Sequence, residues 1–177
     1  KKGYCHIWQK YKDLTFEHIP PHKAFNYISA RSIEGDDVLK LMTDENRMPW
    51  ETTGLKYKSN QRGMGMHSLC QKCNNLTGKY YGNEYIKFAN TIHLLFPQIK
   101  EKIKDKRPQV AGIQINGINP LLFAKQVLSM FCSTCPNITK KDPEIIDLLM
   151  NKDKKGLDTK KYKLYMFLLN EYKIGYT

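Results

Sequence analysis

The stretch Leu14-Thr15-Phe16-Glu17-His18-Ile19-Pro20-Pro21 decides how the first half of this chain folds. Apolar and polar residues alternate through it, which predicts a short β-strand. Because proline lacks a backbone N–H donor and restricts the residue before it, the strand is expected to end at Pro20. Glu17 and His18 therefore stand side by side at the end of a strand, just before a turn.

A second stretch, His67-Ser68-Leu69-Cys70-Gln71-Lys72-Cys73-Asn74-Asn75, places an asparagine directly after a Cys-x-x-Cys. The alternation over residues 64–69 predicts a second short strand that runs into the Cys-x-x-Cys turn. Beyond it, apolar residues recur at helical spacing over residues 85–103. Asn119-Pro120 and Asp142-Pro143 each combine an N-cap residue with a first-turn proline, which predicts two more helix starts. Strands followed by helices indicate the α+β class.

The order Glu17-His18-Ile19-x-Pro21, followed by Leu69-Cys70-x-x-Cys73-Asn74, resembles the HNH nucleases of the His-Me finger, or ββα-metal, class. The resemblance extends from Cys5 to about Phe88. It implies an α+β fold with a ββα-metal nuclease core in residues 1–90, within which residues 26–60 form a polar insertion loop. Residues 91–177 are then a C-terminal helical extension that packs on the core or on a protein partner.

The resemblance implies metal-dependent hydrolysis of phosphodiester bonds, with DNA as the favoured substrate and RNA also open. Hydrolysis needs a base that activates water and a cation that offsets charge on the phosphoryl oxygens. His18 takes the role of general base, because a neutral imidazole accepts a proton near pH 7. Glu17 and Asn74 supply the hard oxygen ligands that Mg²⁺ or Mn²⁺ prefers. Adjacent strand residues serve one site only if the strand end bends or the phosphate lies between them.

Two positions depart from the family pattern. The family often has an aspartate where this chain has Glu17, which is a longer arm. An asparagine nine residues before the last metal ligand usually braces the loop that carries the base, and Gly65 stands at that position here. The residues that can take over the bracing role are Asn26, Asn60 and His67.

Three cysteines predict a structural zinc site that lacks one ligand. They are Cys5, Cys70 and Cys73. Structural zinc is held by four side chains, commonly from two Cys-x-x-Cys pairs, and Trp8 stands where the first pair needs its second cysteine. The candidates for the fourth ligand are His6, Cys132 and Cys135. In the alternative interpretation, the three cysteines pack as small apolar side chains without metal.

The chain of 177 residues carries 29 Lys and Arg against 17 Asp and Glu, a net charge of +12, so a polyanion is the expected partner. We favour nucleic acid over a membrane, because the sequence shows no basic amphipathic face and no run of about 20 apolar residues. The expected contacts with nucleic acid are His22, Lys23, Arg62 and Lys79. The N-terminal segment has no apolar leader and the cysteines are odd in number, so we expect a cytoplasmic protein.

Other functions fit parts of the sequence. The HNH resemblance suggests a component of a bacterial or phage restriction or antiviral defence system. A non-catalytic zinc-knuckle module that binds nucleic acid or acts as an adaptor would account for Gly65 and Trp8. A thiol oxidoreductase built on Cys132 and Cys135 is disfavoured, because this pair lies at the end of a predicted helix. A redox pair usually lies at a helix N-terminus, where the dipole lowers the thiol pKa.

Overall fold

The computed structural model describes residues 1–42, 53–102, 114–158, 160–163 and 165, and it has the mixed α+β architecture that the sequence predicts. Its strands are β1 (Lys2–Tyr4), β2 (Tyr11–His18), β3 (Ala30–Ser32), β4 (Lys58–Asn60) and β5 (Gly65–Cys70). Its helices are α1 (Gly35–Met42), α2 (Gln71–Thr77), the π-helical segment η1 (Gly78–Gly82), α3 (Asn83–Lys102), α4 (Pro120–Thr134), α5 (Asn137–Lys141) and α6 (Pro143–Met150). Within the described ranges, no helix is both long and apolar enough to cross a membrane.

A three-stranded antiparallel sheet in the order β1-β2-β5 positions the candidate site residues. β2 pairs with β5 from Leu14 to His18, and β5 contains a β-bulge opposite Thr15 and Phe16. A bulge inserts one extra residue and shifts the alternation of side chains. The extra residue is Ser68, and as a result the neighbouring residues Ser68 and Leu69 are both buried. β2, β5 and α2 thus form a β-β-α succession in which the two strands are adjacent and antiparallel.

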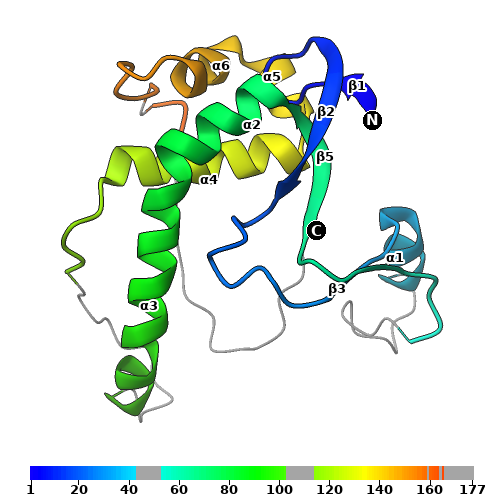
Figure 1. Cartoon of the computed structure of the whole chain (residues 1–177), viewed down its shortest axis with the longest axis horizontal. Coiled ribbons are helices and arrows are strands. Elements are labelled where there is room, and N and C mark those ends of the chain that lie inside the picture. The colour runs from blue at the N-terminus through cyan, green and yellow to red at the C-terminus, as the bar shows by residue number, and fades with distance from the viewer. Residues whose placement is uncertain (43–52, 103–113, 159, 164, 166–177) are drawn as a thin grey trace.

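The chain passes from β5 directly into a long helical path. α2, η1 and α3 follow one another without an intervening loop, and α4 crosses beside η1 (Figure 1). The hydroxyl of Tyr81 in η1 is buried and donates a 2.7 Å hydrogen bond to the carbonyl oxygen of Leu149 in α6. The core draws on both halves of the chain and contains Cys5, Ile7, Leu14, Leu69, Cys70, Cys73, Tyr81, Cys132, Ile145 and Leu149.

Helices α4 and α6 begin at the capped prolines that the sequence predicts. The Asn119 side chain accepts hydrogen bonds from the backbone N–H groups of Leu121 and Leu122, and Asp142 caps α6 in the same way. α4 contacts β5. α4 is also bound to the turn between β1 and β2, because His6 Nδ1 donates a 2.7 Å hydrogen bond to the carbonyl oxygen of Ser133 in α4. The C-terminal helices therefore pack directly on the sheet.

The insertion at residues 26–60 contains more regular structure than its composition indicates. β3 and β4 pair in antiparallel fashion, with Ala30 opposite Asn60, and α1 lies between them in the sequence. The helix agrees with the acidic start at Asp36, whereas strands of three residues are too short to show an alternating pattern. Residues 43–52 of the insertion, and residues 103–113 and 166–177 of the expected helical extension, lie outside the described residues.

Candidate functional site

The candidate site lies where β2 ends beside α2, η1 and α4. A cleft of about 290 Å³ opens there. Glu17 and His18 from the end of β2 and Asn74 from α2 all line it. The three residues for which the sequence predicts a catalytic or metal-binding role therefore line one cleft. Glu17 and His18 both reach it, although they are adjacent in the strand.

His18 is half-buried and is oriented by a backbone carbonyl. Its Nε2 lies 3.1 Å from the carbonyl oxygen of Arg62. A carbonyl oxygen only accepts hydrogen bonds, so Nε2 carries the proton in the neutral ring and Nδ1 keeps a lone pair. The ring is flanked by Phe16 and His22, with centroid distances of 5.1 and 5.0 Å. His18 thus has the tautomer that a general base at Nδ1 requires.

Glu17 is buried, with only 5% of its surface exposed. Its Oε2 accepts hydrogen bonds from the hydroxyls of Ser68, at 3.1 Å, and of Ser133, at 2.6 Å. Desolvation raises the pKa of the carboxyl to about 7, although both serine hydroxyls act to lower it. Both bonds use Oε2, and among the described residues no donor reaches Oε1. One carboxylate oxygen is therefore held in place and the other remains for a ligand in the cleft.

The buried carboxyl of Glu17 predicts a dependence of stability on pH. Its pKa of about 7 lies above the ordinary value of 4.5, so the folded protein binds this proton more tightly than the unfolded chain does. The resulting stabilisation is complete below pH 4.5 and is lost as the pH rises through about 7. Without added Mg²⁺ or Mn²⁺, we expect the free energy of unfolding to fall across this window by on the order of 3 kcal/mol relative to Glu17→Gln. Denaturant titrations at several pH values test this, and parallel curves for the two proteins would contradict it.

Asn74 is oriented by the two residues of β2 that lie opposite the bulge of β5. Its Nδ2 donates hydrogen bonds to Oγ1 of Thr15, at 3.0 Å, and to the carbonyl oxygen of Phe16, at 3.2 Å. Neither bond uses Oδ1. The amide is thereby fixed by its nitrogen, and its oxygen is left as a hard acceptor beside Glu17 in the lining of the cleft.

Of the three residues considered for the bracing role, Asn26 makes the connection. Its Nδ2 donates to the carbonyl oxygens of Pro20, at 2.6 Å, and Met64, at 2.7 Å, and its Oδ1 accepts from the Met64 N–H at 2.6 Å. These bonds join the turn after His18 to the start of β5. Asn60 instead donates to the Ser32 hydroxyl.

The bracing asparagine of HNH nucleases would have no room at the position of Gly65. A Cβ atom there would lie 2.2 Å from the carbonyl oxygen of Glu17 on the paired strand. The close approach of the two backbones therefore requires glycine at this position. His67, the third residue considered for the bracing role, packs its ring against Phe16, with the centroids 5.5 Å apart.

Because the Asn26 side chain makes these contacts, its replacement by alanine is expected to have a large effect on stability. Asn26→Ala removes three hydrogen bonds and leaves the partly buried backbone groups of Pro20 and Met64 without this partner. We expect it to lower the free energy of unfolding by about 2 to 4 kcal/mol. The matched control is Asn60→Ala, which removes one exposed hydrogen bond and should cost less than about 1 kcal/mol. Equal losses in chemical denaturation would show that Asn26 has no special role.

The sulfur atoms of Cys5, Cys70 and Cys73 lie within 4.8 Å of one another and are buried, so these cysteines could hold a metal ion. A hydrogen bond from the Cys73 thiol, assisted by backbone N–H groups of Cys70, Trp8 and Ile7, lowers the pKa of Cys5 to about 5. The same contact with Cys5, together with burial, raises the pKa of Cys73. The cluster therefore favours one thiolate even before a cation adds its charge.

None of the expected fourth ligands joins the described thiol cluster. His6 is turned toward the Ser133 carbonyl, and Cys132 and Cys135 lie outside the group. The Sδ atom of Met150 lies 3.8 Å from Cys73 Sγ, within hydrogen-bond distance of that thiol. The ring of Trp8 lies between two ammonium groups, with Nζ of Lys10 at 4.8 Å and Nζ of Lys72 at 4.5 Å from its centroid. Trp8 is thus used in cation–π contacts at the position where the predicted zinc site needs a fourth cysteine.

The expected contacts with nucleic acid divide into two groups. His22 packs its ring beside that of His18. Lys23 is exposed and follows His22 in the sequence. Arg62 is also exposed, and its carbonyl oxygen lies within hydrogen-bond distance of His18 Nε2. Lys79 instead extends over the ring of Tyr80 on η1, 5.5 Å from its centroid, and does not line the cleft. His22 and Arg62 are therefore near His18, whereas Lys79 lies on the exposed surface of η1.

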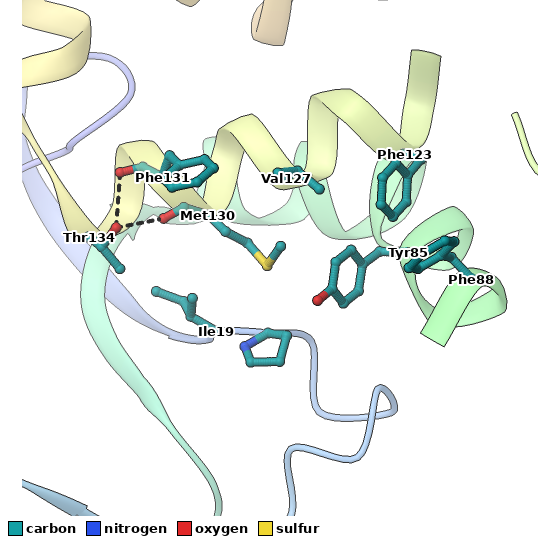
Figure 2. Close-up of a pocket in the computed structure, with 9 residues that line it drawn as sticks. Ile19, Tyr85, Phe88, Phe123, Val127, Met130, Phe131 and Thr134 are labelled. Carbon is teal, nitrogen blue, oxygen red and sulfur yellow. Dashed lines mark hydrogen bonds between the residues drawn. The ribbon is translucent and has the colours of Figure 1, made fainter. Parts of the chain in front are cut away.

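An apolar groove of about 270 Å³ begins at Ile19, directly after the end of β2. Figure 2 shows Ile19, which follows His18, facing Met130 of α4 and Tyr85 of α3 across this groove. The rings of Tyr85 and Phe123 are parallel, with centroids 5.7 Å apart. The sequence gives no sign of this groove, because its walls come from segments about 100 residues apart.

Compared with protein-family models, with curated proteins and with solved structures, the chain matches none of them. The function of this chain is therefore inferred from the geometry of the cleft and of the thiol cluster.

Proposed function

We propose that this chain is a metal-dependent endonuclease of the HNH, or His-Me finger, type, which hydrolyses phosphodiester bonds in DNA. One observation carries the proposal: Glu17, His18 and Asn74 line a single cleft. Each has an atom that suits its role and takes part in none of that residue's hydrogen bonds within the described part of the chain, namely Oε1 of Glu17, Nδ1 of His18 and Oδ1 of Asn74. The succession β2, β5, α2 supports a ββα-metal core around these residues.

In the proposed reaction, His18 accepts a proton from water at Nδ1, and the hydroxide attacks the phosphorus atom. The P–O bond to one sugar oxygen breaks, and that oxygen leaves and takes a proton from solvent water. The hydrogen bond from Nε2 to the Arg62 carbonyl keeps the ring in place and stabilises the imidazolium that forms. Asn26 holds the turn that follows the base, because it binds both Pro20 and Met64. When bound, a divalent cation supplies charge stabilisation for the phosphoryl oxygens and the leaving group.

The donor sets fit two different cations. Glu17 and Asn74 offer hard oxygens, which suit Mg²⁺ or Mn²⁺, and water and substrate phosphate would complete the shell. The thiol cluster of Cys5, Cys70 and Cys73 is soft and buried, which suits a structural Zn²⁺. The cluster also joins the β1–β2 turn to the start of α2, so a zinc ion there would stabilise the strand and the helix that carry the site.

The net charge of +12 supports a nucleic-acid substrate. His22, Lys23 and Arg62 are the proposed phosphate contacts near the base, with Lys79 on the adjoining surface. We propose DNA as the preferred nucleic acid, and by analogy with HNH nucleases a role within a restriction or antiviral defence system. The helical half would then also offer a surface to a protein partner.

The test is cleavage of supercoiled plasmid DNA by the wild-type protein in Mg²⁺ or Mn²⁺, compared with His18→Ala. Nicking that requires both the cation and His18 supports the proposal. Nicking that is the same in the two proteins would contradict it.

The second candidate is a non-catalytic zinc-knuckle module that binds nucleic acid or serves as an adaptor. Trp8 favours it, since the thiol cluster lacks a fourth cysteine and the Trp8 ring is paired with Lys10 and Lys72. Gly65 no longer favours it, because Asn26 makes the bracing contacts. This candidate predicts binding of DNA without cleavage in any divalent cation.

A further inference from the structure

A glutamine from the C-terminal half also lines the candidate cleft. Gln126 lies on α4, and only 3% of its surface is exposed. Its Oε1 is buried and has no hydrogen-bond partner among the described residues. No functional role for this residue was predicted from the sequence.

An unpaired amide oxygen of this kind is unfavourable for the fold. Burying a polar atom without a partner costs about 1 to 3 kcal/mol, and few native groups remain in that state. Ser129 Oγ, one turn further along α4, is the other unpaired buried oxygen or nitrogen in the described side chains. Ser129 does not line the cleft, so the feature that distinguishes Gln126 is an unpaired oxygen at the cleft wall.

The surroundings of Gln126 indicate what pairs with this oxygen. Glu17 and Asn74, in the same lining, have one oxygen each that takes part in none of their hydrogen bonds. Gly82 also lines the cleft, and a Cβ atom there would remain 3.9 Å from Gln126 Oε1. Unused oxygen acceptors from three residues of one cleft lining are suited to a hard cation, which takes about six oxygen ligands.

The geometry points to Gln126 Oε1 as a third protein oxygen ligand, with Glu17 and Asn74, of the divalent cation in this cleft. The inference rests on the proposed function for the identity of the cation and adds a ligand from α4. It also gives α4 a direct part in the site, beyond packing against the sheet.

The test measures metal binding without any cleavage. Mn²⁺ is titrated into the whole chain in the absence of nucleic acid, and free Mn²⁺ is followed by electron paramagnetic resonance. Gln126→Leu removes the amide and nearly keeps its volume, so we expect Mn²⁺ affinity to fall at least tenfold. Gln126→Glu keeps an oxygen and should bind Mn²⁺ at least as tightly as the wild type. Ser129→Ala is the matched control and should leave the affinity unchanged.

The possible results separate this inference from the proposed function. Wild-type affinity in Gln126→Leu would overturn the inference, and cleavage that depends on His18 would leave the function intact. Weakened binding in Gln126→Leu, together with no cleavage by the wild type, would support the cation site and contradict the nuclease. Absence of any Mn²⁺ binding by the wild type would overturn the inference. If Gln126→Leu is less stable than the wild type in the absence of metal, a structural role for the amide replaces the proposed one, since removing an unpaired oxygen should not destabilise the fold.

Discussion

Replacing His18 with alanine is expected to lower the rate of plasmid cleavage in Mg²⁺ or Mn²⁺ by about 10²- to 10⁴-fold. The carbonyl of Arg62 holds the proton on Nε2, so Nδ1 is the atom that can take a proton from water. Alanine removes this base and leaves the oxygens of Glu17 and Asn74 in place. The variant should therefore still bind Mn²⁺ and unfold at the temperature of the wild type. The measurement is the time course of conversion of supercoiled to nicked plasmid.

Two other histidines provide controls for this experiment. His67 packs on Phe16 and does not line the cleft, so His67→Ala should cleave at close to the wild-type rate. His22 lies beside the His18 ring, and His22→Ala should lose activity mainly through weaker binding of substrate. A loss in His67→Ala as large as that in His18→Ala would indicate a general disturbance of the sheet. No cleavage by the wild type in either cation would exclude the mechanism.

Local signals in the sequence predicted the elements that carry the site. Alternation and paired prolines identified the strand that ends at His18, and the capped prolines at residues 120 and 143 identified two helix starts. These features depend on residues only a few positions apart, so a single sequence displays them. Glu17, His18 and Asn74 line one cleft, and their roles in a reaction stay a prediction.

Contacts between residues far apart in the sequence could not be predicted in the same way. Asn26 was one of three bracing candidates, and only the fold distinguishes it from Asn60 and His67. Ser133, which binds Glu17 from 116 positions away, carries no local signal at all. Lys125 and Gln126 are noticeable in the sequence, because they are polar residues within an otherwise mostly apolar helical segment.

Buried polar residues in such a helix usually have a specific partner. Lys125 is fully buried and donates a 2.9 Å hydrogen bond from Nζ to the Asn151 carbonyl, at the end of α6. A cation at a helix C-terminus is stabilising, which accounts for this lysine as a structural residue. Oε1 of Gln126 has no such partner in the part of the chain that the structure describes, and this contrast within one helix separates a structural polar residue from a candidate ligand.

Replacing Cys73 with alanine is expected to abolish binding of zinc and to lower the melting temperature by about 8 to 16 °C. The three thiols lie within 4.8 Å of one another, and the lowered pKa of Cys5 favours a thiolate in the cluster. A ligand that binds only the folded state at 1,000 times its Kd stabilises it by about 4 kcal/mol. For a chain of 177 residues, each kcal/mol shifts the melting temperature by roughly 2 to 4 °C. Elemental analysis of the purified protein and thermal unfolding measure the two effects.

Cys135→Ser is the matched control, because Cys135 is exposed and lies outside the cluster. It should keep one zinc ion per chain and melt within a few degrees of the wild type. The alternative, in which the cysteines pack as apolar side chains, makes a different prediction. Cys73→Ala would then lower the melting temperature only by the small amount due to one lost sulfur atom, and neither protein would contain zinc. Because zinc binding requires deprotonated thiols, a zinc-containing wild type should also lose its metal on acidification, whereas apolar packing of neutral thiols would be insensitive to that change.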